Sequence, residues 1–86
     1  MGIIDEELAF LDKNRLGYAM LKEVIEKVVK MKGRASLYID VFPQVGEKYG
    51  KSGQCVERDI RYLLKKGGCK LSSKKFIKSV VEKILN

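Results

Sequence analysis

The chain of 86 residues is long enough to form one hydrophobic core and too short for two. Its composition, 45% hydrophobic and 34% charged, is that of a globular protein and excludes an intrinsically disordered chain. The formal net charge of +7 favours a polyanionic partner, although many proteins carry such a charge and this indication is weak by itself. We therefore expect a single domain over residues 1–86.

The residues that most enzymes and metal sites require are missing from the sequence. The chain has no histidine, no glycine-rich phosphate loop and no Cys-x-x-Cys pair, and its two cysteines are Cys55 and Cys69. A Cys55 nucleophile would lack a histidine base, and a four-ligand zinc site would need two carboxylates. We expect no enzymatic activity, no catalytic residue, no metal and no cofactor.

Two features of the sequence bear on the compartment. No apolar run approaches the length of a membrane span. The acidic start lacks the apolar stretch of a signal peptide. The sequence therefore predicts a reduced, cytoplasmic protein without a membrane partner.

Residues 3–13 predict a first helix, because Ile4, Leu8 and Leu11 form an apolar stripe and Asp5 can cap its start. This segment carries four acidic residues against one lysine. Residues 16–31 predict a longer helix, whose apolar residues recur at helical spacing and whose role we interpret as scaffold. Its apolar stripe consists of Leu21, Val24, Ile25, Val28 and Val29.

A short helix is expected over residues 37–42, with Ser36 as its cap. It should be interrupted at Pro43, because proline disfavours helical geometry at the residue before it. Pro43 can then open the next helix, since its fixed φ suits the first helical position.

The stretch from Phe42 to Gly67 predicts two helices joined by a tight turn. Gly50 follows the last periodic residue of the first helix, where a left-handed C-cap favours glycine, and Gly46 allows a close backbone approach. Ser52 is the expected N-cap of a second helix from Gly53 to about Lys66. A short helix, a tight turn and an amphipathic helix are the pattern of a helix-turn-helix, whose second helix enters the major groove of DNA.

The second of these helices divides into an apolar and a polar face. The apolar stripe consists of Val56, Ile60, Leu63 and Leu64, and the opposite face of Gln54, Arg58, Arg61, Tyr62 and Lys65. Arginine matches the two acceptors of guanine in the major groove, and glutamine can pair with adenine in the same way. An ordinary surface helix with solvated charges is the alternative interpretation.

A last helix is expected to start at Ser72 or Ser73, after Gly67 and Gly68. Its wide apolar face consists of Phe76, Ile77, Val80, Val81, Ile84 and Leu85. Two interpretations of this face stay open. It either closes the core or is available for contacts between copies of the chain, which DNA-binding modules often need for specificity.

Four pieces of the sequence resemble, in collinear order, the C-terminal DNA-binding domain of the sporulation master response regulator family. They are Leu16-Gly17-Tyr18 with Leu21-Lys22-Glu23, Phe42-Pro43, the string Val56-Glu57-Arg58-Asp59-Ile60-Arg61, and Phe76-Ile77 through Leu85. The resemblance covers residues 16–86 and leaves the helix expected within residues 1–15 outside it. Nothing in the chain supplies the receiver domain of that family, so it is either a complete short protein or a separated piece.

The resemblance implies an all-α fold, a small bundle of about six helices that contains a helix-turn-helix and binds a short "0A box"-like DNA element. Glu57, Arg58 and Arg61 would then lie at or near the bases. Cys55 stands where the family usually has an arginine, and Tyr62 where it usually has a histidine. The resemblance also implies self-association on tandem sites through Phe76–Leu85. The expected DNA-binding residues are Lys51, Ser52, Gln54, Cys55, Glu57, Arg58, Arg61, Tyr62 and Lys65.

The sequence thus favours a transcription regulator that binds double-stranded DNA at specific sequences. The alternative is a protein-interaction adaptor that keeps the fold and docks a partner through its last helix or its acidic start. RNA binding ranks third, because the sheet-borne aromatic residues of common RNA-binding modules are missing.

Overall fold

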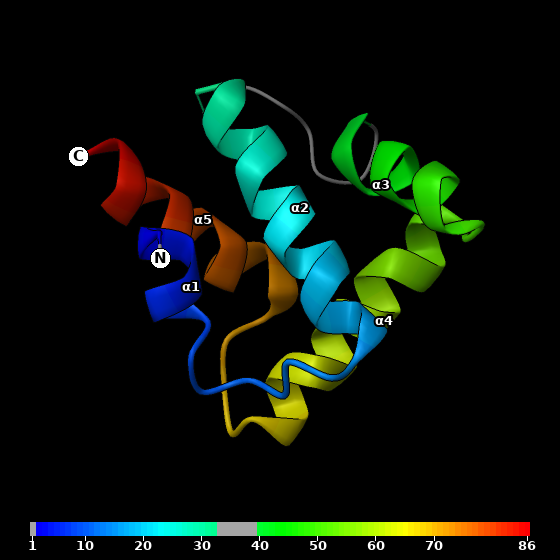
Figure 1. The fold of residues 1–86 in the computed structure, drawn as a ribbon, viewed down its shortest axis with the longest axis horizontal. Coiled ribbons are helices and arrows are strands. Elements are labelled where there is room, and N and C mark those ends of the chain that lie inside the picture. Colours follow the sequence, from blue (N-terminus) through cyan, green and yellow to red (C-terminus); the bar gives the residue numbers. More distant parts are fainter. Residues whose placement is uncertain (1, 33–39) are drawn as a thin grey trace.

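The computed structural model describes residues 2–32 and 40–86, and within these ranges all regular structure is helical (Figure 1). The five helices are α1 (Ile3–Glu7), α2 (Leu16–Lys30), α3 (Phe42–Tyr49), α4 (Gly53–Lys66) and α5 (Ser73–Leu85). The all-α class expected from the sequence is confirmed. The sixth helix was expected over residues 37–42, of which residues 37–39 lie outside the described residues.

Helix α2 is the centre of the arrangement, and each of the other four helices packs against it (Figure 1). It spans Leu16–Lys30, one residue shorter than the sequence predicted. Its apolar stripe is buried as expected, with Val29 only partly so. Lys48 of α3 forms an ion pair with Glu23 of α2, which adds a polar contact between these helices.

One core holds the helices together. It takes side chains from α2, α3, α4 and α5, from residues 8–11 and from Val41. Its members are Leu8, Leu11, Tyr18, Met20, Leu21, Val24, Ile25, Val28, Val41, Phe42, Val45, Val56, Ile60, Leu63, Leu64, Phe76, Ile77, Val80 and Val81. Burial of these side chains is the main stabilising contribution to the fold.

The helix expected over residues 3–13 is shorter than predicted. Helix α1 ends at Glu7, and residues 8–10 form a turn in which the amide of Leu11 donates to the carbonyl of Leu8 at 3.0 Å. Leu8 and Leu11 both enter the core, so the apolar pattern indicated burial correctly. The turn replaces further helix because residues 8–15 must cross to the start of α2.

Asp5 does not occupy the capping position that the sequence predicted. Gly2 is the N-cap of α1, and Asp5 lies inside the helix, where its carboxylate accepts from the Gly2 amide at 3.4 Å. The same carboxylate pairs with Lys22 of α2 at 2.8 Å. The hydrogen bond with Lys22, followed by the one with Gly2, lowers the pKa of Asp5 from its ordinary value.

The break expected before Pro43 is not seen in residues 40–49. Val41 has helical backbone angles (φ −88°, ψ −53°), and α3 begins at Phe42, one residue before the proline. In the first turn of a helix an amide has no carbonyl of the same helix to bond to, so the missing N–H of Pro43 costs nothing there. Burial of Val41 and Phe42 favours this helical entry.

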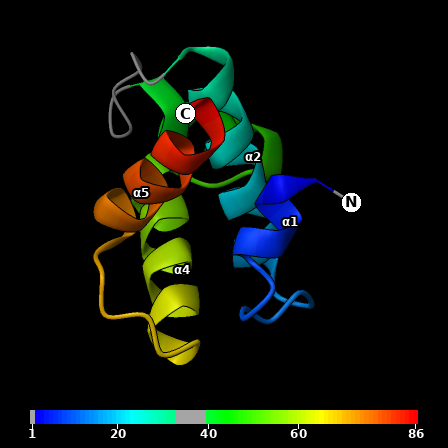
Figure 2. The same cartoon turned by 90° about the vertical axis from the view of Figure 1, so that its left-hand side faces the viewer.

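Helix α5 starts as predicted and closes one side of the core. The Ser72 hydroxyl accepts from the Lys75 amide at 3.3 Å, which caps the helix. Helix α1 packs against α5 (Figure 2). Between these helices, Lys83 Nζ lies 3.0 Å from Glu7 Oε1. Most of the apolar face of α5 is buried, while Ile84 is half-buried and Leu85 is exposed.

No helix in residues 2–32 or 40–86 combines the length and the apolar character needed to cross a lipid bilayer.

Candidate nucleic-acid interface

The turn between α3 and α4 brings the two helices into close contact. Gly50 adopts a left-handed conformation (φ 68°, ψ 31°), as the sequence predicted, and the Lys51 amide donates to the carbonyl of Gly46 at 2.8 Å. A Cβ atom on Gly46 would lie only 2.3 Å from the carbonyl oxygen of Lys51. Only glycine allows this approach, which fixes where α4 starts relative to α3.

The first turn of α4 is capped by Ser52, whose hydroxyl accepts from the Cys55 amide at 3.2 Å. This confirms the predicted N-cap. The inner face of α4 is also as expected, since Val56, Ile60, Leu63 and Leu64 are all buried. The orientation of α4 about its own axis is thereby set, and its polar face turns to solvent.

Four exposed side chains follow the outer surface of α4 in a line: Gln54, Arg58, Arg61 and Lys65. Their spacing of four, three and four positions keeps them on one face of a helix. We call these four residues the outer ridge. Two of them are arginines and one is a glutamine, the side chains that pair in a bidentate manner with base edges.

The arginines of the outer ridge are largely free of carboxylate partners. Arg58 forms no ion pair within residues 2–32 and 40–86, and its Nη2 donates a hydrogen bond to Cys55 Sγ at 3.8 Å. Arg61 has a long contact, 3.9 Å from Nε to Oε2 of Glu57, and its side chain is mostly exposed. Both guanidinium groups are therefore available to an anionic or base-edge acceptor.

Glu57 differs from its neighbours on the expected DNA-binding surface. Its side chain is only 16% exposed, and its Oε2 accepts a hydrogen bond from the Ser73 hydroxyl at 2.8 Å. Ser73 is itself buried at the start of α5. This contact joins α4 to α5, and the sequence did not indicate it.

Tyr62 lies beside the outer ridge, on the flank away from Glu57, and is 52% exposed. Two cations lie over its ring, Arg15 Cζ at 5.7 Å and Lys66 Nζ at 5.2 Å from the centroid. Such contacts are favourable because the ring face is electron-rich. Arg15 precedes the segment covered by the family resemblance, and only the tertiary structure brings it to Tyr62.

Lys51 and Cys55 lie at the amino-terminal end of α4. Lys51 Nζ is 3.4 Å from Oδ2 of Asp59, so its charge is partly neutralised. A side-chain hydrogen bond with Ser52, and to a smaller extent the charge of Arg58, lower the pKa of the Cys55 thiol from its ordinary value, partly opposed by burial. This end of α4 thus favours negative charge, as helix amino termini do.

Within the two described ranges, no group of three or more cysteine, aspartate or glutamate side chains is arranged to hold a metal ion. Comparison of the chain with protein-family models, with curated proteins and with solved structures gave no match.

Proposed function

We propose that this chain binds double-stranded DNA at specific sequences and regulates transcription, with α3 and α4 acting as a helix-turn-helix. In this proposal α4 is the recognition helix and its outer ridge lies in the major groove. The positively charged outer ridge and the net charge of +7 favour the polyanionic duplex.

The outer ridge is the observation that carries the proposal. It presents Gln54, Arg58 and Arg61 to solvent from a helix that is capped, buried along its opposite face and fixed by the Gly46 contact. A base-reading surface needs such preorganisation, because side chains on a loosely held helix would lose more conformational entropy on binding. The resemblance of residues 16–86 to the DNA-binding domain of the sporulation regulator family supports the same role.

The other expected residues take distinct places in the proposed interface. Lys51, Ser52 and Cys55 lie at the amino-terminal end of α4, where backbone amides and positive charge suit a phosphate group. Lys65 extends the outer ridge toward the other end of α4. Glu57 acts mainly through its hydrogen bond to Ser73, which holds α4 against α5.

The decisive experiment is a selection of bound sequences from random DNA duplexes, followed by titration of the selected duplex at two salt concentrations. We expect one enriched motif and an affinity that falls steeply with salt, with a slope of about −0.9 for each phosphate contacted. A scrambled duplex of equal length is the control and should bind more weakly. Enrichment of no motif, together with a flat salt dependence, would contradict the proposal.

Self-association on tandem sites stays a prediction of the same proposal. Most of the apolar face of α5 is buried, so contacts between copies would have to use Ile84, Leu85 and their surroundings. Titration of a duplex with two adjacent copies of the selected motif tests this. Independent binding to the two copies would exclude it.

A further inference from the structure

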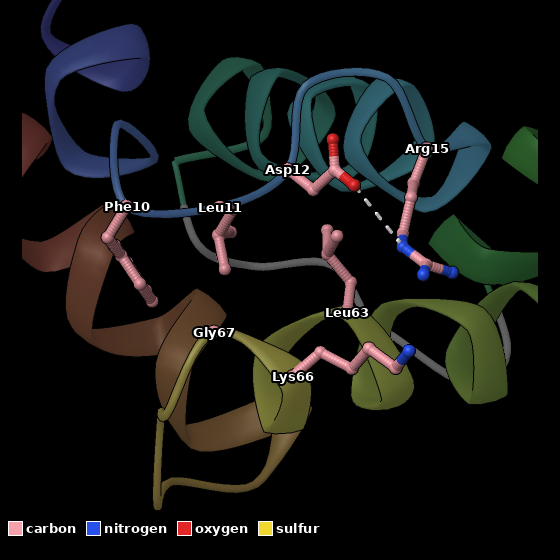
Figure 3. Close-up of a pocket in the computed structure, with 7 residues that line it drawn as sticks. All are labelled: Phe10, Leu11, Asp12, Arg15, Leu63, Lys66 and Gly67. Atoms are coloured by element: carbon pink, nitrogen blue, oxygen red, sulfur yellow. Dashed lines mark ion pairs between the residues drawn. The ribbon is translucent and has the colours of Figure 1, made fainter.

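A groove runs between residues 10–17 and α4, on the flank of α4 next to the outer ridge. It consists of two hollows of ≈ 350 and ≈ 330 Å³, and both are lined by Arg15 and Leu63. The first hollow extends to Phe10 and Gly67, and Figure 3 shows its lining side chains. The second extends to Leu16 and Lys51. We call the two together the Arg15 groove.

The Arg15 groove is separate from the outer ridge. None of Gln54, Arg58, Arg61 and Lys65 lines either hollow. The α4 residues that do so lie on the neighbouring face of the helix. Of the expected DNA-binding residues, only Tyr62 of α4 and Lys51, which precedes α4, line a hollow. The two surfaces share one helix and point in different directions.

Large apolar side chains remain exposed along the Arg15 groove. Phe10 is 49% exposed and Leu16 is 45% exposed, and Tyr62, also exposed, lines the second hollow. Phe10 is also held in place, because its ring meets that of Phe76 edge to face at a centroid distance of 5.9 Å. Exposed apolar groups gathered in this way, on a fixed framework, are typical of a binding surface.

The cations of the groove lie directly beside these apolar groups. Lys66 forms no ion pair in the described part of the chain, and its ammonium group lies over the Tyr62 ring. Among residues 2–32 and 40–86, Arg15 forms an ion pair with Asp12 alone, at 3.5 Å (Figure 3). Both side chains are well exposed. Since an exposed pair of this kind contributes little, Arg15 can exchange Asp12 for a carboxylate of a ligand at small cost.

The combination of groups decides which class of ligand fits. A DNA backbone would satisfy Arg15 and Lys66 but has no apolar group for the hollows beside Phe10 and Leu16. Each hollow lies at the lower end of the range of about 300–1,000 Å³ found for small-molecule sites, which suits one bulky side chain better than a cofactor. A peptide segment supplies both a bulky apolar side chain and a neighbouring carboxylate.

We propose that the Arg15 groove binds a short acidic segment of a partner protein. Bulky apolar side chains of that segment enter the two hollows, and a carboxylate between them pairs with Arg15. A second carboxylate meets Lys66 at the outer edge of the first hollow. The inference does not rest on DNA binding, since the groove and the outer ridge are separate surfaces.

A panel of fluorescein-labelled twelve-residue peptides tests the proposal on the complete chain, with binding followed by fluorescence anisotropy. Each peptide carries two leucine, phenylalanine or tryptophan anchors among glutamates and serines, at varied spacing. Two matched controls replace the anchors by serine or the glutamates by lysine. We expect peptides that carry both the apolar anchors and the glutamates to bind. Replacing the anchors by serine should weaken binding at least about tenfold, and peptides with lysine in place of glutamate should not bind.

Two charge-reversal variants identify the site. Lys66→Glu should weaken binding of the best peptide by about tenfold or more, because it places like charges together. Lys78→Glu makes the same charge change at an exposed position of α5 that lines neither hollow, and should change binding less than about twofold. Thermal unfolding checks that both variants keep the fold. Amide shifts on peptide binding should be confined to residues 10–17 and 59–67.

The proposal is overturned if no peptide of the panel binds, if the shifts lie elsewhere, or if both variants weaken binding equally. It is also overturned if a DNA duplex displaces the peptide while shifting the amides of residues 10–17, because the groove would then belong to a nucleic-acid surface. The peptide titrations contain no DNA, so a failure of the proposed DNA binding would leave their result unchanged.

Discussion

Helices α4 and α5 are built alike and differ in one respect that matters for function. Each starts at a serine N-cap, Ser52 or Ser72, whose hydroxyl accepts from the amide three residues on, and each buries an apolar face in the same core. On the outside, α4 presents arginine and glutamine in a line, whereas α5 presents lysines. A lysine ammonium is a strongly hydrated point charge, while arginine and glutamine can form paired, directional hydrogen bonds. Positive charge on a helix therefore identifies a base-reading surface only together with the type of side chain that carries it.

The largest effect is expected from variants in the buried faces of α4 and α5, which test whether the two helices contribute similarly to the core. Ile60→Ala in α4 and Ile77→Ala in α5 each empty a fully buried site, so each should lower the free energy of unfolding by about 2–5 kcal/mol. Chemical denaturation monitored by circular dichroism measures both. A much smaller loss for either variant would show that its helix contributes less to the core than its burial indicates.

The second prediction tests the difference between the outer faces. Arg58→Ala and Arg61→Ala should each weaken binding to the selected duplex by about 1–3 kcal/mol, or about 5–150-fold in Kd. Lys75→Ala and Lys78→Ala remove exposed charges from α5 and should change the Kd by less than about threefold. All four sites are exposed, so the unfolding free energy should be nearly unchanged. Equal losses from both helices would mean that charge alone drives binding.

A third prediction concerns the contact that joins the two helices. Ser73→Ala removes the hydrogen bond to Glu57 and should destabilise the fold by about 1 kcal/mol, because Glu57 can still reach water. Glu57→Gln keeps an acceptor for Ser73 and is the matched control, with a smaller expected loss. Urea denaturation of both variants gives the comparison. If Ser73→Ala is as stable as the unchanged chain, the contact does not hold α4 to α5.

The smallest expected effect concerns Cys55. Because its pKa is lowered, its thiolate is present at a lower pH than in an ordinary cysteine, and the alkylation rate should rise to half its maximum at a lower pH than for a free thiol. Arg58→Ala should move this midpoint upward, since a nearby positive charge is removed. Iodoacetamide labelling in a Cys69→Ser background measures Cys55 alone. A midpoint at or above that of a free thiol would contradict the assigned environment.

Local sequence signals predicted the parts of the fold that depend on neighbouring residues. Gly50 at the end of α3 and Ser52 at the start of α4 were placed correctly, because left-handed geometry and capping each involve only a few adjacent residues. The apolar stripe of α4 was also correct, since burial at helical spacing leaves a clear pattern. The start of α3 was misplaced because the rule for the residue before proline is a tendency that burial of Phe42 outweighs.

Contacts between residues far apart in the chain could not be predicted in this way. The hydrogen bond of Glu57 with Ser73 and the stacking of Arg15 on Tyr62 depend on how the helices pack. The early end of α1 has the same origin, because the turn at residues 8–10 is required by the path to α2. The four exposed residues of the outer ridge could be identified from helical spacing, whereas the low exposure of Glu57, which the family resemblance placed near the bases, depends on its contact with Ser73.

The contacts of residues 2–11 also have a consequence for the order of folding. Glu7 forms an ion pair with Lys83, and the Phe10 ring contacts the Phe76 ring. The Leu11 side chain lies so close to Gly67 that a Cβ atom at position 67 would touch it. Each of these contacts closes a long loop of the chain. Closing such a loop costs more chain entropy than joining α3 to α4, which are neighbours in sequence. Residues 2–11 should therefore dock after α2, α3 and α4 have assembled. On the ribosome, Glu7 and Phe10 remain without Lys83 and Phe76 until α5 has been synthesised, so this segment is made before its partners and reaches its place after them.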